Sequence, residues 1–178
     1  MPWTLSGSPP SVKVKLCGPD PKADSVTLVE AAGVTQAGEG IDGIRWNILG
    51  QTYVPKQHSE SSLSWHATFP SGTFVPPHIH PNQDEFIYLL EGRLSLVLDG
   101  KDGFADPGDT VRLPRGIPHG LFNRSDYEVK CFFWVTPARR LYDLFWALHN
   151  LGPNADPAQV VAVAAKHEVD FLPPPEGE

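Results

Sequence analysis

Residues 72–92 read GTFVPPHIHPNQDEFIYLLEG and form the most informative stretch of the chain. In an extended segment alternate side chains point to the same side, so His78 and His80 face in one direction. Glu85 follows a short Pro81–Asn82 turn and begins the next strand. We therefore expect two imidazoles and one carboxylate to converge from adjacent strands.

Residues 108–123, GDTVRLPRGIPHGLFN, add a third imidazole. His119 comes directly after a Pro-Arg-Gly-Ile-Pro turn, at the start of another expected strand. Neutral imidazole binds iron, nickel, copper, zinc and manganese, and a carboxylate adds a hard anionic ligand. Scattered polar residues are the alternative, but a barrel interior would not accept them without a compensating ion.

The sequence therefore predicts one divalent transition metal ion, with Fe, Ni, Mn, Zn and Cu all open. The expected ligands are His78, His80, Glu85 and His119. A structural zinc site would be closed and rich in cysteine. This ligand set instead leaves coordination positions open for water, oxygen or a substrate.

Short strands with turns at close spacing surround these two stretches, which is typical of a sandwich or a barrel. The chain has 178 residues, including 16 Gly and 19 Pro, and no internal repeat. Turn signals include Asp99–Gly100 and Asp102–Gly103. The expected strands are Ser25–Glu30, Ile44–Leu49, Ser62–Phe69, Glu85–Leu90, Arg93–Asp99, Thr110–Leu113, Gly120–Asn123 and Glu128–Thr136.

The last forty or so residues change to helical spacing. Thr136–Pro137 offers an N-cap and a first helical position, and apolar residues then recur from Leu141 to Leu148. Asp156–Pro157 begins a second helix. We expect two short helices that cover one end of the barrel. The predicted organisation is an N-terminal Pro-rich arm (1–25), a barrel (26–136) and a C-terminal helical segment packed on it (137–178).

Composition and charge restrict location and partners. The net charge of -7 argues against nucleic acid, which needs a basic surface. We find no apolar run that would span a membrane and no secretory signal, so we expect a cytoplasmic protein without membrane contact. Cys17 and Cys131 are far apart, and Cys131 lies in the apolar run CFFWV, which favours a buried thiol over a disulfide. We expect a homodimer, because an open sheet leaves an edge that needs covering.

The two stretches resemble the cupin superfamily. The first cupin motif matches Gly72, His78, His80, Glu85 and Gly92, and the second matches Gly108, Pro114, Gly116, His119 and Asn123. The resemblance implies an all-β jelly-roll barrel, the double-stranded β-helix, with two short C-terminal helices added. It places a metal ion inside, on the four residues named above, and gives Asn123 a structural part in bonding nearby backbone.

A narrower resemblance extends over nearly the whole chain. The sequence looks like bacterial single-cupin proteins related to quercetin 2,3-dioxygenase, through PPHIHP, Asp84–Glu85 and a terminal helical pair. It implies a metal-dependent dioxygenase acting on a small aromatic or enolic, flavonol-like substrate with dioxygen, and Glu85 would also be the catalytic base. The alternatives are another metal-dependent enzyme, an isomerase or decarboxylase, and a non-catalytic cupin that binds a small molecule.

The other aromatic residues and histidines have less specific roles. Phe74 and Phe86 flank the metal motif and are pocket candidates. Phe132, Phe133 and Trp134 fit core packing better than substrate contact. We expect His58 in a solvated loop and His66 at a hydrogen-bonded surface position, with a pocket as the alternative for His66. His149 and His167 lie near expected helix C-termini, which favour positive charge.

Overall fold

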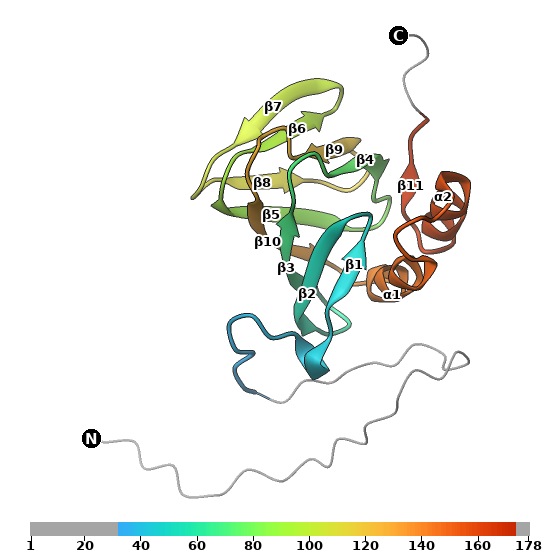
Figure 1. Ribbon diagram of the computed structural model, residues 1–178. Coiled ribbons are helices and arrows are strands. Elements are labelled where there is room, and N and C mark those ends of the chain that lie inside the picture. Colours follow the sequence, from blue (N-terminus) through green and yellow to red (C-terminus); the bar gives the residue numbers. More distant parts are fainter. Residues whose placement is uncertain (1–31, 174–178) are drawn as a thin grey trace, which may run out of the picture.

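The computed structural model describes residues 32–173. The expected arm (1–25), the expected strand Ser25–Glu30 and Cys17 lie outside these residues. Most of the described chain forms two antiparallel sheets, and two helices lie at one side of them (Figure 1). Within this part of the chain, no helix is both long and apolar enough to cross a membrane.

One sheet contains six strands and the other five. Their orders are β1-β2-β3-β10-β5-β8 and β11-β4-β9-β6-β7. Consecutive strands thus alternate between the sheets along much of the chain, which is the arrangement of a jelly roll. The strands are β1 (Trp46–Ile48), β2 (Gln51–His58), β3 (Leu63–Phe69), β4 (Phe74–Ile79), β5 (Asp84–Glu91), β6 (Leu94–Leu98), β7 (Lys101–Ala105), β8 (Thr110–Leu113), β9 (His119–Phe122), β10 (Val129–Thr136) and β11 (Asp170–Phe171).

The core follows from strict alternation in the central strands. In β10, Cys131, Phe133 and Val135 are buried, while the residues between them are partly exposed. In β5, Ile87 and Leu89 are buried in the same way. Each buried position faces the space between the sheets, so these strands fix which side chains reach the interior.

Several strands were missed because their residues resemble turns. β2 contains Pro55, β4 contains Pro76–Pro77, and the expected turn at Asp102–Gly103 lies inside β7. Proline is tolerated where a ladder bond is not needed, and the β2–β3 and β4–β9 ladders change register near these prolines. The Asp99–Gly100 turn joins β6 to β7, and both residues have positive φ.

The two helices are α1 (Leu141–Leu151) and α2 (Pro157–Lys166), and a short 3-10 turn, η1 (Ile41–Gly43), precedes β1. The expected start of α1 at Thr136–Pro137 is wrong, because Thr136 still pairs with Asp84 as the last residue of β10. The start of α2 agrees with the expectation: the Asp156 carboxylate accepts a hydrogen bond from the Ala158 N–H at 3.1 Å.

α1 packs against the barrel through aromatic side chains. The Phe145 ring centroid lies 5.0 Å from that of Trp65 and 5.2 Å from that of Tyr53. After α2 the chain returns as β11 and pairs with β4, placing Phe171 opposite His78. The helical segment therefore lies against one end of the barrel, beside the strand that carries His78 (Figure 1).

Asn123 has the structural part that the motif implies. Its side-chain amide donates to the carbonyl oxygens of Phe69 at 2.9 Å and Tyr127 at 2.6 Å. Its oxygen accepts from the Ser125 N–H at 3.0 Å. These bonds tie the end of β3 to the loop between β9 and β10.

Candidate metal centre

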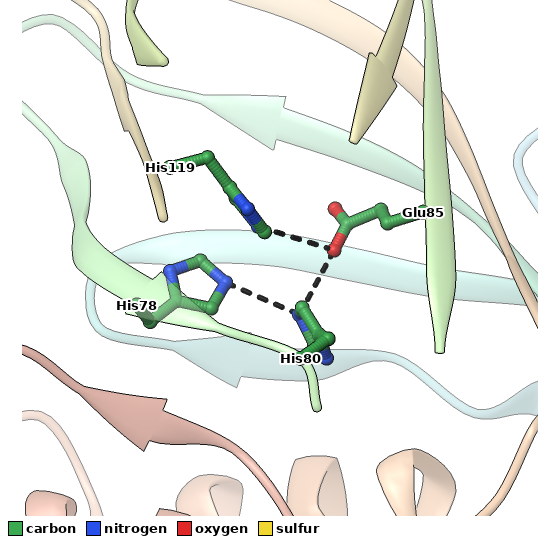
Figure 2. A group of neighbouring side chains, drawn as sticks. All are labelled: His78, His80, Glu85 and His119. Atoms are coloured by element: carbon green, nitrogen blue, oxygen red, sulfur yellow. Dashed lines mark hydrogen bonds and ion pairs between the residues drawn. The ribbon is translucent and has the colours of Figure 1, made fainter. Parts of the chain in front are cut away.

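The structure brings the four predicted ligands together. His78 lies in β4 and pairs with His119 of β9, His80 follows the end of β4, and Glu85 points inward from β5. One ligand atom from each residue lies within 4.8 Å of all the others, and all four side chains are buried. Figure 2 shows the four converging on one point.

Local backbone features hold these positions. Glu85 faces inward because it shares the buried face of β5 with Ile87. The carbonyl of His80 accepts from the Gly116 N–H at 2.9 Å, in the loop that leads to His119. That loop is also tied to β5, since the Asp84 carboxylate accepts from the Arg115 main chain at 3.0 Å and from its guanidinium at 2.6 Å.

The hydrogen bonds of the three rings determine their tautomers. Each Nδ1 lies beside an oxygen that only accepts: the Pro76 carbonyl at 2.8 Å for His78 and the Ile117 carbonyl at 2.9 Å for His119. For His80 the acceptor is the Gln83 side-chain oxygen at 3.1 Å. A neutral ring that donates through Nδ1 carries a lone pair on Nε2. All three Nε2 atoms are therefore available as ligand atoms.

These lone pairs face one another and one carboxylate oxygen. The Nε2 atoms of His78 and His80 are 3.2 Å apart. Glu85 Oε2 lies 3.0 Å from His80 Nε2 and 3.7 Å from His119 Nε2, which has no hydrogen-bond partner among the described residues. Buried acceptors without a hydrogen between them repel each other, and a cation at their centre removes that cost. The residues thus fit a divalent transition metal ion with three nitrogen ligands and one oxygen ligand.

The protonation states fit the same ion. Burial, followed by the neighbouring His119 and His80 rings, holds the pKa of His78 well below its usual value. Burial opposes ionisation of Glu85, but protonated Nε2 atoms of His119 and His80 would donate to the carboxylate and lower its pKa, and a cation at the centre of the group would stabilise the carboxylate in the same sense. Both groups are therefore in the form that binds metal near neutral pH, since metals take neutral imidazole and ionised carboxylate.

An apolar cavity opens beside three of the four residues, and His119 is not part of its lining. The free space of the cavity is about 500 Å³, part of which is open solvent, and its lining includes His78, His80 and Glu85. Tyr53 also lines it, and its hydroxyl donates to the buried Gln51 side-chain oxygen at 3.2 Å. Burial chiefly raises the pKa of Tyr53, with smaller effects of Glu85 and Cys131, so this residue stays a neutral phenol. The other lining residues are Ile48, Leu49, Trp65, Val75, Leu121, Phe133, Leu141, Leu144, Phe145, Leu148, Val169 and Phe171.

The two pocket candidates of the sequence do not line this cavity. Phe86 neighbours Glu85 in β5, so it points to the opposite face and stacks on Trp134 at 5.1 Å. Phe74 is 49% exposed and stacks on Phe122 at 5.9 Å. The register shift in β4 between Val75 and His78 breaks the alternation, so Val75 lines the cavity instead.

The remaining histidines lie outside the group of four. The expectation of a solvated loop for His58 is wrong: it ends β2, is 8% exposed and stacks on Tyr142 at 4.3 Å. His66 faces outward in β3, between the buried Trp65 and Ala67. His149 accepts from the Asn47 N–H at 3.1 Å through Nδ1.

Sequence reasoning missed several cavity residues, one of which a simple signal could have found. In β3, Trp65 is one of the apolar residues that alternate with the polar Ser64, His66 and Thr68, which indicates an inward direction. In β2, Tyr53 lies beside the buried Val54, so that strand has no such clear signal. Phe133 was assigned to the core and lies there, but it also lines the cavity. Gln83 lies inside the stretch that predicts the metal ligands, but a glutamine between a turn and a strand has no pattern that marks it as part of a site.

Comparison with known proteins gives a family model and partial relatives. Residues 65–136 match the family model of the cupin domain. Tetracenomycin polyketide synthase protein TcmJ of Streptomyces glaucescens is 28% identical over 77 residues, 43% of this chain and 52% of that protein. Quercetin 2,3-dioxygenase of Bacillus subtilis (strain 168) is 40% identical over 48 residues, 27% of this chain and 14% of that protein. The matched part therefore spans about half of the first relative and much less of the second.

A solved structure agrees with the fold. The structure of KdgF from Halomonas sp. superimposes with a TM-score of 0.50 at 18% sequence identity, covering 67% of this chain and 99% of that one. At this identity the similarity concerns the fold alone.

Proposed function

We propose that the chain, whose residues 65–136 match the family model of the cupin domain, is a metal-dependent dioxygenase of a small aromatic or enolic, flavonol-like substrate. The observation that carries the proposal is one cavity that combines an apolar wall with candidate metal ligands. An apolar wall with several aromatic rings suits an aromatic body, and the group of four residues suits an ionisable oxygen. Dioxygen is the second substrate and the oxidant.

The partial relatives support the same substrate class. One is named a polyketide synthase protein and another quercetin 2,3-dioxygenase. Quercetin is a phenolic compound with an enolic hydroxyl, which is the kind of group that this site would bind. A divalent ion held by the four residues would act as a Lewis acid and lower the pKa of such a hydroxyl.

Glu85 is the proposed base. Both of its contacts with histidine use Oε2, so Oε1 is the atom that would take the proton of the enolic hydroxyl. The carboxylate is ionised near neutral pH and can accept a proton, but its lowered pKa makes it a weak base, so the Lewis acidity of the ion would have to make the hydroxyl acidic enough. The enolate that results is electron-rich and is oxidised by dioxygen, with both oxygen atoms entering the product. The apolar wall excludes water from the reacting atoms.

The first experiment measures oxygen uptake by metal-loaded protein over a panel of flavonols and other enols. We expect one dioxygen consumed for each substrate molecule converted. Conversion without oxygen uptake would contradict the proposal in favour of an isomerase or a decarboxylase. Tight binding without conversion of any compound would contradict it in favour of a binding protein.

The second experiment tests the base with Glu85→Gln, whose amide oxygen can still bind a metal but cannot take a proton. At metal content matched to the unaltered protein, we expect oxygen uptake to fall about a hundredfold or more. Glu91→Gln is the matched control, because Glu91 ends the same strand on the outside, paired with Lys130 at 2.8 Å. Full activity of metal-loaded Glu85→Gln would rule out the base role.

A further inference from the structure

Gln83 is a buried amide with a contact at each end. Its side chain is 1% exposed, directly before β5. Its nitrogen donates to the carbonyl oxygens of Pro137 at 3.0 Å and Ala138 at 2.7 Å. Its oxygen lies 3.1 Å from His80 Nδ1. Since both amide hydrogens go to carbonyls, the orientation of the amide is fixed, and only its oxygen can face His80.

We propose that Gln83 is a positioning residue that sets the tautomer and the direction of His80. By accepting from Nδ1–H, it leaves the lone pair of His80 on Nε2, aimed at His78 and Glu85. The inference rests on the metal site of the proposed function but assigns a residue that this function does not include.

The three rings differ in what holds them. His78 and His119 each donate to a main-chain carbonyl two positions earlier in the chain, so the strand itself fixes them. His80 depends on a side chain instead. It is therefore the one ligand candidate among the described residues whose second nitrogen can be released by a single substitution elsewhere.

The other end of Gln83 reaches the segment before α1. Pro137 and Ala138 follow β10, and α1 then contributes Leu144 and Phe145 to the cavity wall. Gln83 thus joins a metal ligand to the start of the helix that a substrate would contact. A change in α1 on ligand binding would be transmitted to His80 through Gln83, by the two hydrogen bonds that its nitrogen donates and the one that its oxygen accepts.

Two variants separate the role of Gln83 toward His80 from its role in the fold. Gln83→Leu keeps the volume and removes every hydrogen bond. Gln83→Glu keeps an acceptor for His80 and loses the donors to Pro137 and Ala138. Gln51→Leu is the matched control, because Gln51 is equally buried and bonds Tyr53 but no ligand candidate.

The first measurement is the dissociation constant of zinc ion, by competition with a chelating dye. We expect Gln83→Leu to bind zinc about 10- to 100-fold more weakly, and Gln83→Glu and Gln51→Leu to stay within a few-fold of the unaltered protein. Equal weakening in all three variants would mean a general loss of stability and would overturn the inference, as would unchanged binding in Gln83→Leu.

The second measurement needs no metal and no activity. In metal-free protein, nitrogen-15 NMR should show His80 protonated on Nδ1 in the unaltered protein and in Gln83→Glu. In Gln83→Leu we expect a mixture of tautomers for His80 alone. An unchanged His80 spectrum in Gln83→Leu would overturn the inference. If the unaltered protein binds no metal, the metal site fails, and the tautomers still decide the role of Gln83.

Discussion

His78 is the ligand candidate whose protonation the barrel changes most clearly. Burial and the two neighbouring rings lower its pKa from a reference value of 6.5, so the unfolded chain binds this proton more readily than the folded protein does. Stability then rises with pH above the lowered folded value and levels off above the unfolded one. The pKa of Glu85 is also lowered. This residue therefore also makes the free energy of unfolding rise with pH, but in a more acidic range, below its reference value of 4.5.

We therefore expect metal-free protein to lose stability as the pH falls below about 6.5, by up to about 1.4 kcal/mol per pH unit from His78. Urea unfolding at several pH values measures the slope. His78→Gln removes the group, so the slope just below that pH should flatten. A stability that is constant or rises on acidification would contradict the assignment.

The ligand candidates could be predicted from sequence because each depends on short-range geometry. His78 and His80 are two positions apart, and Glu85 and His119 follow recognisable turns. The cavity residues could not be predicted in the same way. The expectation that Phe74 lines the pocket is wrong because β4 shifts register before His78. A bulge of this kind depends on how the partner strand β9 pairs, which the local sequence does not show.

The turns on either side of β6 offer a comparison at the level of single elements: the first leads from β5 in the other sheet, and the second is the β6–β7 hairpin. Gly92 precedes β6 and Gly100 follows it, with φ of 76° and 73°. A Cβ on Gly92 would lie 2.9 Å from a Val129 methyl carbon and 3.1 Å from the Glu128 carbonyl oxygen. A Cβ on Gly100 would have nothing within 4 Å.

We expect Gly100→Ala to cost about 1–2 kcal/mol, from the left-handed conformation alone. Gly92→Ala should cost about 1–3 kcal/mol more, because the added methyl group overpacks the start of β10. Denaturant unfolding of both variants gives the difference. Equal losses would show that the backbone near Val129 moves aside without cost.

At the level of elements the sequence predicted the strands with clear alternation and missed those with irregular composition. β5, β6, β8 and β10 lie within a residue or so of the expected ranges. β2 and β4 contain prolines, and β11 has only two residues, so none of them carries a local signal. Their existence depends on neighbouring strands that accept the pairing, which is information from the tertiary structure.

For the whole molecule, the metal should contribute to stability, because an ion that binds only the folded barrel shifts the unfolding equilibrium. At a free ion concentration a hundredfold above the dissociation constant, the gain is about 2.7 kcal/mol. For a chain of this size we expect a chelator to lower the melting temperature by roughly 5–10 °C, and added zinc to restore it. His119→Ala should show little response to either. Identical melting of both forms without metal binding would contradict the site.

The oligomeric state stays a prediction, and it rests on the edge strands of the two sheets. The two sheets end at β1 and β8 and at β11 and β7, and unpaired edges favour contact with another chain. We expect a homodimer at micromolar concentration, measured by light scattering, with residues 1–25 or an edge strand at the contact. Deletion of residues 1–25 distinguishes these two contacts. A monomer under these conditions would contradict the prediction and leave the metal site untouched.

The pairing of β11 with β4 has a consequence for the order of events during synthesis. A ribosome makes His78, His80, Glu85 and His119 before it makes α1, α2 and β11. Since chains fold from the N-terminal side as they emerge, the ligands can meet while that end of the barrel is still uncovered. If the four residues meet at that stage, they are open to solvent on the side that β11 later covers. Once Phe171 lies against His78, that side of the ligand group is covered.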